Sequence, residues 1–170
     1  MKIIKYPSKS QWPDIVKRPH LDLSQLNATV KNVLDDVKAH GDEAVRHYEQ
    51  QFDHVSLDSL AVSEEEIEEA FQTISTELKA SLELAHHNIA AFHEAQRFEG
   101  KKIETAPGVD CWQKSVPIEK VGLYIPGGTA PLFSTVLMLA TPAKIAGCKE
   151  IVLCTPPNRE GKINPAILAA

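Results

Sequence analysis

The stretch that decides the fold runs from residue 121 to residue 157 and reads VGLYIPGGTAPLFSTVLMLATPAKIAGCKEIVLCTPP. It opens with an apolar run, Val121 to Ile125, that is typical of a buried strand. A proline and two glycines form a turn, and an apolar helix is expected from Leu132 to Ala146, ended by Gly147. A second buried strand is expected from Glu150 to Cys154. This order predicts a βαβ unit with two parallel strands and a right-handed crossover.

The chain before this unit is predicted to be mainly helical. Apolar residues recur at helical spacing in four successive segments. The first three helices are expected to be capped by Ser24, Asp42 and Ser63, and the fourth extends over Leu78 to Gln96. Ser63 and Glu66 have the spacing of a capping box, in which each residue bonds to the backbone N–H of the other.

The sequence is therefore of the α/β class, and we divide it into three parts. Residues 1–20 contain three prolines and are expected to form an irregular arm. Residues 21–118 are the mostly helical part of a first α/β domain, with two short strands near 102–116 around the turn Ala106-Pro107-Gly108. Residues 119–170 contain the βαβ unit and are the beginning of a second α/β domain. A helix starts near Asn164 and no further strand follows it, so we expect this domain to be truncated.

Composition excludes several classes of protein. The net charge is −5, which does not indicate a nucleic-acid-binding surface. The sequence has no apolar run of about 18 residues, so a membrane-spanning helix is not expected. The three cysteines, Cys111, Cys148 and Cys154, lack paired spacing, and a reduced, cytoplasmic protein is the simplest interpretation.

The turn after the first strand of the βαβ unit is the main candidate binding site. It places Tyr124, Gly127 and Gly128 between the carboxyl end of a strand and the amino end of a helix, where open α/β sheets bind ligands. Free backbone N–H groups and the helix dipole favour an anion such as a pyrophosphate there. From the residues alone a second interpretation stays open, in which the glycines only make a tight turn and Tyr124 lies in the core.

The residues also suggest two other kinds of site. Cys148 or Cys154 could act as a thiolate nucleophile. However, Cys154 lies in an apolar run that suggests burial, and Cys148 follows a helix C-terminus, where the dipole disfavours a thiolate. The seven histidines suggest a metal site, but no HxxxH or CxxC pattern occurs, and no metal ligand is assigned.

The same stretch resembles histidinol dehydrogenase. The resemblance rests on VGLYIPGG at 121–128, PLFSTVLM at 131–138 and PAKIAGC at 142–148. Upstream, KAHGDEA at 38–44 and APGV at 106–109 resemble the same family in the same order. The resemblance covers nearly the whole chain, and residues before Leu21 are its least diagnostic part.

This resemblance implies an aldehyde-dehydrogenase-like, Rossmann-like fold and a zinc- and NAD-dependent homodimer. It implies oxidation of L-histidinol through L-histidinaldehyde to L-histidine, the end of histidine biosynthesis. Tyr124 matches the family's NAD-binding tyrosine. The catalytic glutamate–histidine pair and the zinc ligands are expected beyond the position of Ala170, so no catalytic residue is assigned to this chain.

Three hypotheses follow. The first is that the chain is the N-terminal portion of a histidinol dehydrogenase and is inactive alone. The second is a non-catalytic α/β nucleotide-binding module. The third is a relative of the cysteine-dependent aldehyde dehydrogenases, which would need Cys148 or Cys154 as its nucleophile.

Overall fold

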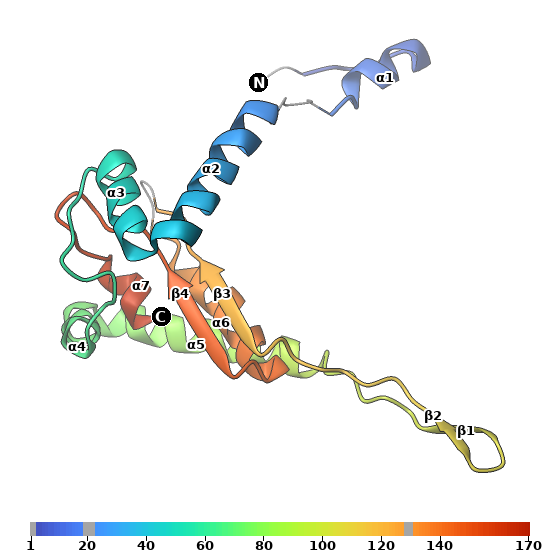
Figure 1. The fold of residues 1–170 in the computed structure, drawn as a ribbon. Coiled ribbons are helices and arrows are strands. Elements are labelled where there is room, and N and C mark those ends of the chain that lie inside the picture. The colour runs from blue at the N-terminus through green and yellow to red at the C-terminus, as the bar shows by residue number, and fades with distance from the viewer. Residues whose placement is uncertain (1–2, 19–22, 128–130) are drawn as a thin grey trace. The chain divides into compact units, whose positions relative to one another are not determined.

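The computed structural model describes residues 3–18, 23–127 and 131–170. The chain divides into two units, Met1–Val45 and Arg46–Ala170, each of which is described by itself. The first contains a 3-10 turn (Lys9–Gln11), α1 (Trp12–Ile15) and α2 (Ser24–His40), and α3 (Asp42–Phe52) continues into the second unit. Figure 1 shows the elements in chain order.

Two expectations for the first unit were wrong in detail. The arm contains the 3-10 turn and α1 rather than only irregular chain, because the Ser8 N–H donates to Gln11 Oε1 (2.9 Å) and Pro13 lies in the first turn of α1, where proline is tolerated. Ser24 is the first residue of α2 rather than its cap, because the Leu23 carbonyl already accepts the Asn27 N–H at 2.8 Å. The predicted end of this helix at Gly41 is confirmed.

The remaining predicted helices exist, with corrections at two ends. Asp42 is the first residue of α3 rather than its cap, because the Gly41 carbonyl already accepts the Val45 N–H at 3.2 Å. In the second unit, α4 spans Glu64–Thr73, and α5 spans Thr76–Glu94, so it ends two residues before Gln96. The capping box is formed as expected: the Ser63 N–H donates to Glu66 Oε2 at 2.8 Å, and Ser63 Oγ accepts the Glu66 N–H at 3.2 Å. None of the helices in the described ranges is both long and apolar enough to cross a membrane.

The βαβ unit is also confirmed. It consists of β3 (Lys120–Tyr124), α6 (Phe133–Ala146) and β4 (Glu150–Cys154), and the two strands pair in parallel. Gly147 ends α6 in the left-handed conformation, with φ of 88°, as its position after the apolar run predicts. The last helix, α7 (Pro165–Ala169), is capped by Asn164, whose Oδ1 accepts the Ala166 N–H at 2.9 Å.

Only one face of the strand pair is covered by the described residues. Figure 1 shows α6 on one side of β3 and β4, and the core there consists of Ile125, Val136 and Ile167. On the other face Val152 is 51% exposed and Cys154 is exposed. The expectation of fully buried strands, with Cys154 in the core, is therefore wrong for this chain, because side chains alternate between the faces and the described residues place a helix on only one of them.

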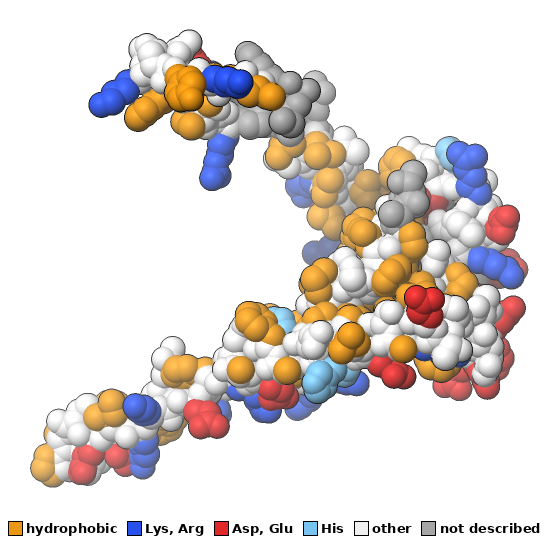
Figure 2. Space-filling model, turned by 180° about the vertical axis from the view of Figure 1, so that it is seen from behind, with side chains coloured by type: hydrophobic (Ala, Val, Ile, Leu, Met, Phe, Trp, Pro, Cys, Tyr) orange, Lys and Arg blue, Asp and Glu red, His pale blue; other side chains and the backbone are white. Residues whose placement is uncertain are grey.

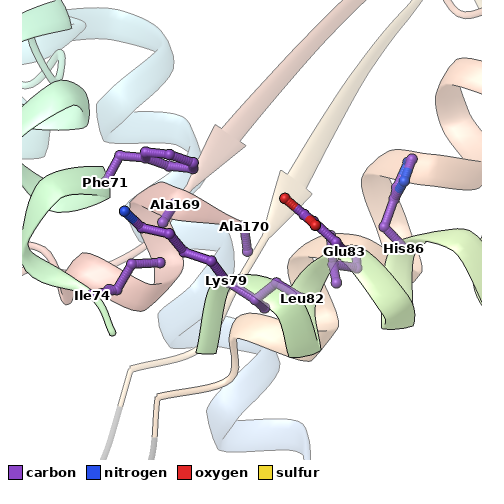
Figure 3. A pocket seen from close by; sticks show the side chains of 9 residues that line it. Phe71, Ile74, Lys79, Leu82, Glu83, His86, Ala169 and Ala170 are labelled. Atoms are coloured by element: carbon purple, nitrogen blue, oxygen red, sulfur yellow. The ribbon is translucent and has the colours of Figure 1, made fainter. Parts of the chain in front are cut away.

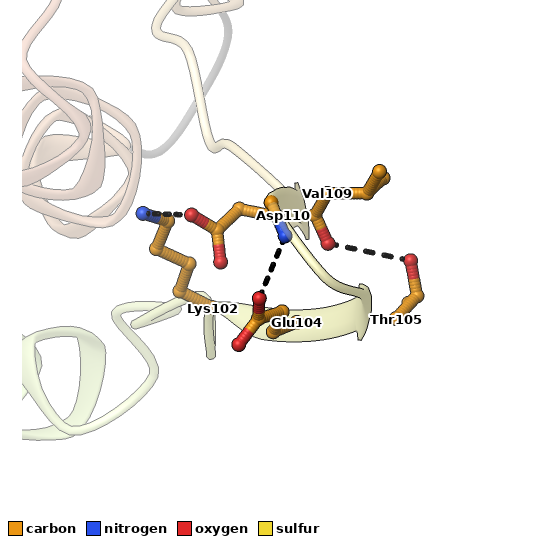
Figure 4. A network of polar contacts seen from close by, with 6 residues as sticks. Lys102, Glu104, Thr105, Val109 and Asp110 are labelled. Carbon is orange, nitrogen blue, oxygen red and sulfur yellow. Dashed lines mark hydrogen bonds and ion pairs between the residues drawn. The ribbon is translucent and has the colours of Figure 1, made fainter.

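The antiparallel hairpin is confirmed, with a shorter second strand than expected. β1 (Ile103–Ala106) pairs with β2 (Val109–Cys111), and Ile103 opposite Cys111 is the last pair, so the residues up to Val116 have no partner in β1. Figure 4 shows its polar contacts. They are Lys102 Nζ to Asp110 Oδ2 (2.6 Å), the Gly108 N–H to Glu104 Oε1 (2.8 Å) and Thr105 Oγ1 to the Val109 carbonyl (3.4 Å).

Glu49, on α3, gives a prediction about pH. Desolvation raises the pKa of its carboxyl, the nearby Asp53 raises it further, and Arg46 lowers it. Its Oε2 atom is buried without a hydrogen-bond partner among the described residues. The charged form of Glu49 therefore lowers the free energy of unfolding. This loss of stability is complete above the pKa of the folded state, and it disappears once the pH falls below the ordinary pKa of a glutamate carboxyl. We expect Glu49→Gln to raise Tm at pH 7 by about 1–2 °C.

Thermal unfolding between pH 7 and pH 4 checks this. The gain from Glu49→Gln should shrink as the pH falls, because the native carboxyl then becomes neutral as well. Glu68→Gln, which changes an exposed carboxylate on α4, is the matched control. A gain from Glu49→Gln that grows on acidification would contradict the prediction.

Candidate functional site

The candidate site lies where β3 and β4 end. Their parallel pairing brings both carboxyl ends to one edge, with Tyr124 next to Cys154 in register. Tyr124 is 63% exposed, so its ring lies on the open face of the pair and not in the core. The alternative interpretation, in which Tyr124 lies in the core of the described residues, is therefore excluded. Parallel α/β sheets bind ligands at this edge.

The backbone beside Tyr124 is held firmly. Ile125 is fully buried, at 0% exposure, in the core with Val136 and Ile167. Its N–H donates to the Cys154 carbonyl at 2.9 Å, which extends the ladder between the strands by one bond. The exposed ring of Tyr124 is thus followed directly by the buried side chain of Ile125, which fixes the point at which the turn leaves the sheet.

Gly127 contacts a residue that the sequence interpretation missed. A Cβ at position 127 would lie 2.5 Å from Cγ of Pro156, so the turn packs directly against the chain that leaves β4. The sequence shows only Thr155-Pro156-Pro157 after the second strand, a pattern that is typical of the end of a strand. Gly128, the third predicted site residue, lies outside the described residues.

The amino end of α6 follows the turn along the chain, after residues 128–130, which lie outside the described ranges. Leu132 occupies the N-cap position and makes no side-chain bond to the helix, although its carbonyl accepts the Thr135 N–H at 2.9 Å. Backbone N–H groups in the first turn of a helix and the helix dipole favour an anion. The arrangement can therefore bind a ligand that has an aromatic or polar part for Tyr124 and an anionic part for the helix end.

The other candidate residues are not brought together. Cys148 is half-buried before β4, and Cys154 lies at the far end of that strand. Among the described residues no group of three histidine, cysteine or acidic side chains is placed to hold a metal ion. His93 packs edge-on against Phe92, with ring centroids 5.5 Å apart.

A pocket between α4, α5, α6 and α7 is separate from the turn. Its volume is about 280 Å³, slightly below the range of about 300–1,000 Å³ that is usual for ligand sites. Figure 3 shows Lys79 directed at Phe71, with Nζ 4.5 Å from the ring centroid, and Glu83 and His86 further along α5. No residue of the turn lines it. We assign no chemistry to it.

Comparison with known proteins gives a consistent result. The family model described as histidinol dehydrogenase matches residues 16–170. Histidinol dehydrogenase of Bacteroides fragilis is 64% identical over 170 residues, which is 100% of this chain and 40% of the relative. Histidinol dehydrogenase of Escherichia coli K12 is 52% identical over 148 residues, 86% of this chain and 34% of the relative.

A solved structure agrees with the sequence comparisons. The crystal structure of histidinol dehydrogenase from Elizabethkingia anophelis has a TM-score of 0.90 and 46% identity, and covers 96% of this chain and 38% of its own. The chain thus spans 40% of the length of the Bacteroides relative. The mixed helices, parallel pair and antiparallel hairpin are a fragment of that α/β fold.

Proposed function

The chain belongs to the histidinol dehydrogenase family, and we propose that it forms part of an enzyme that oxidises L-histidinol to L-histidine through L-histidinaldehyde. The match over residues 16–170 is the observation that carries this proposal. Since the chain spans 40% of the Bacteroides relative, the activity is assigned to a protein longer than this chain.

Within that enzyme, the turn after β3 is proposed to hold NAD. The residues fit this group, because an exposed Tyr124 ring, Gly127 and the amino end of the 14-residue helix α6 follow one another along the chain after the carboxyl end of β3. Tyr124 would stack against or hydrogen-bond to the dinucleotide, and the backbone at Gly127 and Gly128 would approach it closely. Bound NAD supplies the acceptor for hydride, and the residues of this chain bind and orient it.

Zinc and the proton-transfer residues are proposed to belong to the part of the enzyme outside this chain. Within the described ranges, no three histidine, cysteine or acidic side chains lie close enough together to hold the ion. We further propose that the enzyme is a homodimer in the cytoplasm, as the family resemblance implies. Trp12, which is 50% exposed, is available to a partner subunit.

The proposal is tested by comparing two proteins. One is the 170-residue chain, and the other is a chimaera in which this chain replaces the matching segment of the Bacteroides fragilis relative. With L-histidinol, NAD and zinc, we expect NADH formation by the chimaera and none by the chain alone. A folded chimaera that forms no NADH, or NADH formation by the chain free of host enzyme, would contradict the proposal.

A further inference from the structure

We propose that Pro156 is a positioning residue of the cofactor turn, whose ring fixes the path of the backbone at Gly127. The inference rests on the proposed function of the turn and adds a residue to it. Pro156 follows β4 and lies far from the turn in the sequence. The parallel pairing of β3 with β4 brings the two segments together.

The contact is too close for any residue but glycine at position 127. A Cβ there would lie 2.5 Å from Pro156 Cγ and 3.6 Å from both Cβ and Cδ of the same ring. Real Cβ atoms essentially never come within 3.0 Å of another heavy atom, so one of the two segments would have to move. The requirement for glycine here comes from the packing of the turn on Pro156.

Pro156 cannot yield easily. Its ring is closed onto its own backbone nitrogen, so the ring follows the main chain and has no rotamer that swings it aside. Pro157 restricts the backbone of Pro156 further. Upstream, the Cys154 carbonyl is held by the Ile125 N–H at 2.9 Å. The ring therefore keeps a fixed position beside the turn.

The position of the Pro156 ring matters for ligand binding as well as for folding. Tyr124 is placed by β3, whereas the helix end is placed by α6, and Gly127 lies on the chain between them. Pushing Gly127 away from Pro156 would shift the backbone that must approach the dinucleotide. The ring of Pro156 carries no polar group, so its contribution to the turn is to geometry.

The test measures NAD binding by calorimetry, and Tm, in the chimaera and its variants. We expect Gly127→Ala to raise the Kd for NAD about tenfold, an effect of the size usual for residues in direct contact. Pro156→Ala alone should raise the Kd only about threefold, because the turn loses its support but is not displaced. In the double variant the clash with Cγ is gone, so its Kd should return to that of Pro156→Ala and stay well below that of Gly127→Ala. Gly122→Ala is the matched control, because it lies in β3 with nothing within 4 Å of its added methyl group.

Each outcome decides the inference. Recovery of NAD affinity in the double variant supports it, as does a Gly127→Ala protein that fails to fold while the double variant folds and binds. A double variant as weak as Gly127→Ala overturns it, and so does a Gly127→Ala protein with lowered Tm but unchanged Kd. If the unaltered chimaera does not bind NAD, the proposed function itself fails; if it binds without rescue, only the role of Pro156 fails.

Discussion

Replacing Tyr124 by alanine should weaken NAD binding to the chimaera about 30-fold, since stacking of a base on an aromatic side chain contributes about 2 kcal/mol. The side chain is 63% exposed at the edge of the sheet, so its removal leaves no cavity in the described core. We therefore expect Tm to stay within about 2 °C of the unaltered protein. Calorimetric Kd values and thermal unfolding measure the two effects separately.

Two further variants identify which part of Tyr124 acts. Tyr124→Phe keeps the ring and removes the hydroxyl, so full affinity in this variant indicates stacking and a loss indicates a hydrogen bond. Tyr6→Ala removes another exposed tyrosine, 99% exposed in the first unit, and should leave the Kd unchanged. Unchanged affinity in Tyr124→Ala would contradict the placement of NAD at this turn.

Replacing the neighbouring residue, Ile125, by alanine should instead lower the Tm strongly. Ile125 is 0% exposed in the core with Val136 and Ile167, and isoleucine-to-alanine changes in such positions cost about 2–5 kcal/mol. In a chain of this size we expect Tm to fall by about 10 °C. Thermal unfolding of the 170-residue chain followed by circular dichroism measures this.

Val152→Ala is the control for this prediction. It also shortens a β-branched side chain of the strand pair, but Val152 is 51% exposed on the open face, so its Tm should change by no more than about 2 °C. Equal losses in Ile125→Ala and Val152→Ala would mean that both faces of the pair are covered, contrary to the structure.

The βαβ unit itself could be predicted from the sequence, but the exposure of one face of its strands could not. The βαβ unit could be predicted because Gly147 and the length of the apolar runs separate a helix from two strands. The capping box at Ser63 and Glu66 could be predicted because it depends only on residues close in the chain. An apolar run in a parallel strand, however, predicts cover on both faces. The exposure of Val152 and Cys154 depends on which helices pack there, and local pattern does not contain that.

The candidate site divides in the same way. Tyr124 and Gly127 stand out because a turn between strand and helix is a recurring binding geometry. Pro156 does not stand out, because its contact with Gly127 depends on the register of β3 against β4. A sequence specifies this contact only through the pairing of distant segments.

A crystal structure of the chimaera with NAD tests the claim that this chain contributes the cofactor turn of a histidinol dehydrogenase. We expect the dinucleotide at the carboxyl edge of β3 and β4, in contact with the Tyr124 ring and beside Gly127. Density for the dinucleotide elsewhere, with the Tyr124 ring free of it, would contradict the claim.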